Sequence, residues 1–264
     1  MKRIVVAALV GVVISTASYA GHSWSSYHWA RTSNPLNLAI VNSTTGDWVG
    51  HVTQAVTYWN ESGVLNMVEE DGNTANRTRR RCKAPGGKVR VCNLAYGNNG
   101  WLGLAGISLD SAGHITSGYT KLNDTYFTTG SYYSSAEWKQ SVTCQELGHN
   151  VGLAHQDEIF NNTSLKSCMD YQDPPYQYPN DHDYAQLEAI YSSHTEDASD
   201  DGGGGGGGCN APQGKGCNKG KANGHNGEIG WGMSLGRHGQ TESFMRIDPD
   251  GTRHITYVTW VEGH

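Results

Sequence analysis

Apolar residues recur along this chain in two periods, which predict strands first, then helices, then a tail. Short apolar runs between glycine and asparagine turns predict strands at 36–41, 64–68, 89–97, 102–110 and 115–123. Apolar residues at helical spacing predict helices at 48–59, 135–150 and 184–191. Asp47 is the expected N-cap of the first helix, and Asn180 or Asp181 that of the third. This pattern favours an α+β protein.

The two ends of the chain differ from its centre. Lys2 and Arg3 precede an apolar run from Ile4 to Ile14, and small residues up to Ala20 follow. Residues 1–20 are therefore predicted to be a signal peptide. The apolar run is too short to span a bilayer, so we expect a secreted protein, extracellular or periplasmic, with no membrane association.

Seven consecutive glycines at 202–208 follow an acidic segment and predict a linker over 198–208. The linker would separate a main domain, 21–197, from a small β-rich region, 209–264. In that region a Pro-Asp-Gly turn at 249–251 joins two predicted strands. The region is compatible with a surface-binding appendage, with a hairpin packed on the main domain and with a tethered lid.

Length and charge narrow the class of protein. A chain of 264 residues suffices for one full core and a small addition. The formal net charge is -6, and the basic run at 77–81 is short and isolated, so nucleic acid is not an expected partner. We interpret this basic run as a solvated loop, with a protease-sensitive point as the alternative.

Six cysteines in an exported chain favour disulfides over metal binding. Cys82 and Cys92 flank a short turn, and Cys209 and Cys217 lie close together in the tail. Cys144 and Cys168 are then left to pair, although six cysteines permit 15 pairings. The candidate cysteines are Cys82, Cys92, Cys144, Cys168, Cys209 and Cys217.

The stretch CQELGHNVGLAHQD, 144–157, carries the candidate chemistry. Gln145 and His149 are four residues apart on the predicted helix, so they project from one face and can bind the same ion. Gly152 can end the helix in a left-handed conformation, which lets His155 reach that ion. Glu146 beside these groups is placed to accept a proton from water.

QELGHNVGLAHQD with the later SCMDY resembles the zinc signature and Met-turn of the metzincin clan, in particular its matrixin-like secreted metallopeptidases. The resemblance extends over roughly residues 28–194. It implies a zincin-like catalytic domain with a twisted, mostly parallel five-stranded sheet and three helices, to which a small β-rich C-terminal appendage is added.

The same resemblance implies a Zn²⁺-dependent endopeptidase acting on protein or peptide substrates, and we expect the protein to be a monomer. Glu146 would be the general base, and Gln145, His149 and His155 would be the metal ligands. Met169 would lie beneath the metal, and Tyr171 would donate a hydrogen bond in the transition state. The LGLAG strand resembles the rim strand that pairs with an extended substrate.

Gln145 departs from the signature, which has histidine there. An amide oxygen is a poorer zinc ligand than imidazole, so we expect the affinity to fall by a factor on the order of 100 or more. His182 or Asp157 could replace Gln145 as donor. The acidic segment 69–72 would suit structural Ca²⁺, although its spacing matches no calcium motif. A catalytically silent peptide-binding protein is the alternative to the enzyme.

Overall fold

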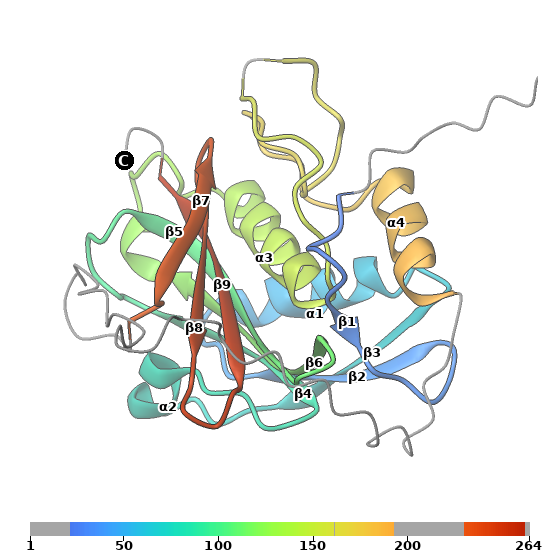
Figure 1. Ribbon diagram of the computed structural model, residues 1–264. Helices are drawn as coiled ribbons and strands as arrows, with labels where there is room; N and C mark the ends of the chain where they lie inside the picture. The colour runs from blue at the N-terminus through green and yellow to red at the C-terminus, as the bar shows by residue number, and fades with distance from the viewer. Residues whose placement is uncertain (1–21, 161, 193–229, 262–264) are drawn as a thin grey trace, which may run out of the picture.

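The computed structural model describes residues 22–160, 162–192 and 230–261 (Figure 1). The predicted signal peptide, the glycine linker and the proposed pair of Cys209 with Cys217 lie outside these residues. Among the residues described, no helix is long and apolar enough to cross a bilayer.

In the part of the chain that the structure describes, one sheet of nine strands forms the frame. Its path runs β3-β2-β4-β6-β5-β9-β8-β7, and β1 pairs with β6. The strands are β1 (His28–Trp29), β2 (Leu36–Asn42), β3 (Leu65–Asp71), β4 (Lys88–Leu94), β5 (Trp101–Leu109), β6 (His114–Asn123), β7 (Met233–His238), β8 (Thr241–Ile247) and β9 (Arg253–Trp260).

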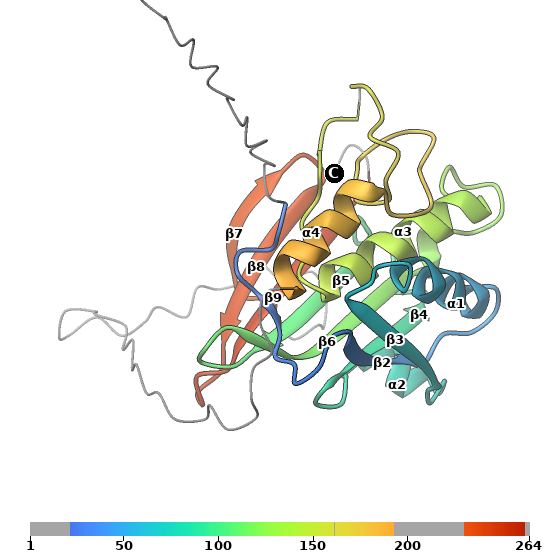
Figure 2. The same ribbon diagram turned by 90° about the vertical axis from the view of Figure 1, so that its right-hand side faces the viewer.

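The helical elements are α1 (Trp48–Trp59), α2 (Asn76–Arg81), a 3-10 helix η1 (Asp124–Tyr126), α3 (Ala136–Asn150) and α4 (Asp181–Tyr191). Figure 2 shows α1, α3 and α4 together on one side of the sheet. Asn180 caps α4 in a capping box with Asp183, as the sequence predicts for its start. The arginine run interpreted as a loop instead forms α2, whose Arg79 donates to the carbonyl of Asn93.

The fold class predicted from the resemblance, a twisted, mostly parallel five-stranded sheet with three helices, is wrong. The sheet has nine strands, four of its strand pairs are antiparallel, and the antiparallel ladders join more residues than the parallel ones. The difference arises because β9 pairs with β5, so the C-terminal strands continue the sheet (Figure 1).

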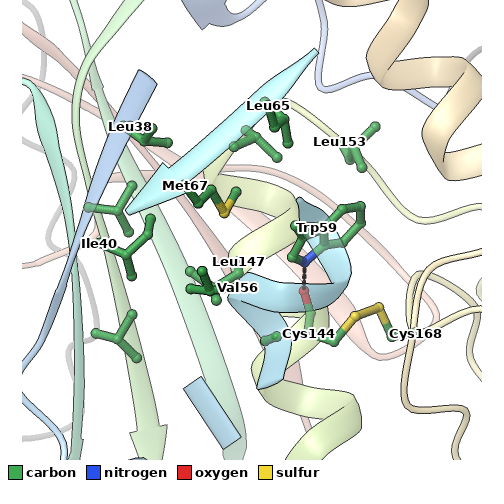
Figure 3. Packing of buried hydrophobic residues seen from close by; sticks show 14 of the residues in the cluster. Leu38, Ile40, Val56, Trp59, Leu65, Met67, Cys144, Leu147, Leu153 and Cys168 are labelled. Atoms are coloured by element: carbon green, nitrogen blue, oxygen red, sulfur yellow. Dashed lines mark hydrogen bonds between the residues drawn. A yellow bond between two sulfur atoms is a disulfide. The ribbon is translucent and has the colours of Figure 1, made fainter. Parts of the chain in front are cut away.

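The main core lies between the sheet and the helices. Trp59 of α1 is fully buried and donates its indole N–H to the carbonyl of Cys144 at 3.0 Å (Figure 3). Leu147 of α3 and Met67 of β3 lie in the same cluster. Burial of side chains of this size contributes roughly 1.5 to 3 kcal/mol each, so this contact fixes α3 against α1.

Two of the three predicted disulfides are present in the structure. Cys82 pairs with Cys92, and Cys144 pairs with Cys168. The second bridge joins α3 to the loop before α4 (Figure 3). Both are compatible with an oxidising, extracellular compartment.

Candidate metal centre

The end of α3 determines how the two histidines meet. Gly152 has a φ of 95°, its N–H donates to the carbonyl of His149, and the N–H of Leu153 donates to that of Gly148. These two bonds form a Schellman motif, which ends the helix and reverses the chain. A Cβ at Gly152 would lie 2.5 Å from the carbonyl oxygen of Tyr27, so glycine is required here for space as well.

His149 and His155 face each other through their Nε2 atoms, which lie 3.0 Å apart. The Nδ1 atom of His149 lies 2.8 Å from the carbonyl oxygen of Leu153, and that of His155 lies 3.0 Å from a carboxylate oxygen of Glu158. The carbonyl oxygen of Leu153 can only accept, so Nδ1 of His149 carries the proton, and the ionised carboxylate of Glu158 favours the same tautomer of His155. Two Nε2 lone pairs therefore point into one small space.

Both rings are neutral at physiological pH. Burial lowers the pKa of His149 well below its usual value, and the neighbouring His155 lowers it further. Burial also lowers the pKa of His155 to about 3. A second proton on either ring is therefore held weakly near pH 7. A metal cation binds the lone pair of a neutral imidazole, so the neutral rings are the form that binds metal.

The Gln145 side chain completes a set of three donors. Its Nε2 lies against Nε2 of His155 and 3.4 Å from the hydroxyl of Thr259. In this arrangement the amide N–H of Gln145 donates to the Nε2 atom of His155. A half-turn of the amide would direct its oxygen toward the histidines, as metal binding requires.

Glu146 is fully buried one residue from Gln145. One carboxylate oxygen accepts a bond of 2.8 Å from the hydroxyl of Thr259, while the other has no partner among the described residues. Burial raises the pKa of Glu146 to about 8, and the bond from Thr259 partly opposes this shift. A Cβ at Gly103 of β5 would lie 2.7 Å from the same carboxylate, so that glycine lets β5 approach the acid.

Met169 and Tyr171 come from the loop that Cys168 joins to α3. The carbonyl of Met169 accepts from the N–H of Gln156, which places this loop beside the chain that follows His155. The buried Tyr171 ring lies 4.6 Å from that of His155, and its hydroxyl bonds to Thr241. The structure thus places Gln145, His149, His155 and Tyr171 in one contiguous group of side chains.

Three C-terminal residues at the site were missed by sequence reasoning. Thr241 of β8 lies 3.1 Å from Nδ1 of His155, and Thr259 of β9 holds Glu146. Tyr257 of β9 stacks on His149 with ring centroids 4.7 Å apart. The alternation in HITYVTWV predicts a strand with one buried face, but no local signal tells which surface that face covers.

The alternative donors make contacts with other residues. His182 stacks on His22, with ring centroids 4.5 Å apart, and the carboxylate of Asp157 accepts from Ile159 and Asn162. Most of the acidic segment considered for calcium belongs to β3, where Glu70 pairs with Lys88. Within the described ranges, no group of three His, Cys, Asp or Glu side chains forms a metal-ligand set, because the donor beside the two histidines is an amide.

The site is closed to solvent. The most exposed of its predicted residues is His155, at 7 %. A cavity of about 340 Å³ lies elsewhere, lined by residues of α1 and the first half of α3 such as His51 and Gln140. Comparison with models of protein families and with curated proteins finds no match.

Proposed function

We propose that this protein is a secreted, zinc-dependent endopeptidase that uses Gln145, His149 and His155 to hold the metal. The observation that carries the proposal is the pair of Nε2 lone pairs 3.0 Å apart, each fixed by a hydrogen bond at Nδ1. The amide N–H of Gln145 lies against the Nε2 lone pair of His155, and a cation in its place would bind the lone pairs of both histidines. Such bonds at the second nitrogen are typical of histidines that bind metals.

The donor set suits zinc in its chemistry. Imidazole nitrogens are common zinc ligands, and with a third protein donor they leave a position for water or substrate. A bound zinc ion supplies Lewis acidity, which lowers the pKa of water and polarises a carbonyl group.

The side chains of the chain supply the remaining roles. Glu146 would accept the proton of the attacking water and pass it to the leaving amine. Burial raises its pKa to about 8, so Glu146 is protonated at pH 7 without metal, and a cation beside it would favour the ionised form that acts as the base. Tyr171 would donate its hydroxyl proton in a hydrogen bond to the developing oxyanion.

The test compares wild type with Glu146→Ala, and uses Glu188→Ala as a matched control because Glu188 is exposed on α4. Each protein is loaded with zinc, its metal content is measured, and it is incubated with an extended peptide. We expect cleavage by wild type and the control, loss on chelation, and a loss of at least about 100-fold in Glu146→Ala. Equal cleavage by wild type and Glu146→Ala would refute the role of Glu146.

A silent peptide-binding protein is the second candidate. The observation that favours it is the amide at the third ligand position, together with the burial of the site. In that case zinc-loaded wild type would bind the peptide without cleaving it.

A further inference from the structure

The C-terminal hairpin lies where a substrate would have to bind. β5 has only two edges: β6 pairs along one, and β9 pairs along the other from Trp101 to Leu109. β5 is also the strand that approaches Glu146, through Gly103. An extended peptide can reach this edge only when β9 is absent, because each backbone N–H and C=O of an edge bonds one strand at a time.

The β9 side chains that face α3 also cover the residues proposed to bind the metal and to accept the proton of water. Tyr257 lies over His149, and the Thr259 hydroxyl bonds to the Glu146 carboxylate. From β8, Thr241 engages both Tyr171 and His155. The hairpin therefore fills the hydrogen-bonding positions of the groups proposed to act on substrate and closes them to water.

The opposite face of the hairpin holds it in place. Val258 is fully buried and packs with Trp101 and Leu104 of β5. On that same face His254 bonds to Ser108 at 3.0 Å. These contacts do not touch the metal site, so the attachment of the hairpin can be altered without changing the site.

We propose that the hairpin of β8 and β9 is an intramolecular inhibitor, which takes the place of an extended substrate on β5 and must leave before a peptide can be cleaved. This inference rests on the proposed function. Because the inhibitor and the domain are one chain, substrate competes with a segment at high effective concentration. Activity is then limited by the fraction of molecules in which β9 has left β5.

A reversible covalent lock tests the proposal in the full chain. Ser108 and His254 are register partners whose side chains touch, so the double variant S108C/H254C can form a disulfide across β5 and β9. We expect the oxidised, zinc-loaded variant to cleave peptide at least about tenfold more slowly than the mildly reduced one. The single variants S108C and H254C, treated with the same reductant, control for the native disulfides, and the two in the described residues are buried.

A loosening variant tests the opposite direction. Val258→Ala removes buried contacts of the hairpin and is expected to raise peptide cleavage about three- to tenfold. Val91→Ala, which truncates an equally buried valine in β4, is the matched control and should not raise it. Equal rates for locked and reduced protein, together with no gain in Val258→Ala, would overturn the inference.

Failure of the proposed function would look different. If neither the locked nor the reduced protein cleaves peptide while both hold zinc, the endopeptidase assignment fails. Binding of a fluorescent extended peptide to the same two samples then decides the inference. Binding to the reduced form alone supports it, whereas equal binding or no binding to either form overturns it.

Discussion

Replacing Gln145 by histidine is expected to tighten zinc binding. Gln145 is 4 % exposed and already lies against the Nε2 atom of His155, so a ring at this position would reach the same space. A histidine buried there would be neutral at pH 7, and would bind metal without first releasing a proton. The change therefore restores a stronger ligand at a position where the backbone already directs the side chain.

The size of the gain follows from the kind of contact that changes. Loss of a partner behind a ligand costs about 10- to 100-fold in metal affinity, so exchanging the ligand itself should alter the affinity by about 100-fold or more. At saturating zinc this corresponds to about 2.7 kcal/mol of additional stability. For a chain of this size the melting temperature of the zinc-loaded protein should rise by about 5 to 11 °C relative to zinc-loaded wild type.

Competition with a chromophoric chelator gives the Kd, and thermal unfolding with and without zinc gives the stability. Gln145→Met is the matched variant, because it keeps the length of the side chain and removes the amide. We expect the order of affinity to be histidine, then glutamine, then methionine. If all three proteins bind zinc equally, residue 145 is not a ligand and the proposed set of donors is wrong.

Three further measurements address the surroundings of the site. Tyr171→Phe removes one hydroxyl and should lower kcat by about 100-fold with little change in KM, and an unchanged kcat would exclude Tyr171 from catalysis. Burial raises the pKa of Asp170 to about 6 from 3.8, so the folded state favours the protonated acid and stability falls as pH rises between these values. Asp170→Asn should abolish that fall and be more stable than wild type at pH 7, and the same urea-unfolding difference between pH 4 and 7 in both proteins would contradict this. The double variant Cys144→Ser/Cys168→Ser opens a loop of 24 residues and should lose about 3 kcal/mol in chemical unfolding, so a loss near zero would mean that the bridge adds no stability.

Local patterns predicted much of the main region. The helix from Trp48 to Trp59 has the predicted bounds, and α3 and α4 differ from their predicted bounds by a few residues at the N-terminus. The short helix α2 was missed because its six residues bury no apolar side chain, so it has no hydrophobic period. Strand β1 was missed because two residues are too few to show an alternation.

The gathering of the candidate site was also predictable, because it depends on short spacings. Residues 145, 149 and 155 meet through one helix and one glycine turn, and the Cys144–Cys168 bridge brings the loop with Tyr171 to them. The hydroxyls of Thr241 and Thr259 come from strands about 100 residues later. Their contacts depend on register within the sheet, and no nearby residue in the sequence encodes that register.

The sequence by itself determined which candidate side chains meet and the turn that brings them together, because helical periodicity and glycine conformation act over a few residues. Only the tertiary structure decided that β9 lies on β5 and closes the site. An alternating strand can bury its apolar face against any complementary surface, and the choice among such surfaces is made by packing and backbone hydrogen bonds across the whole sheet.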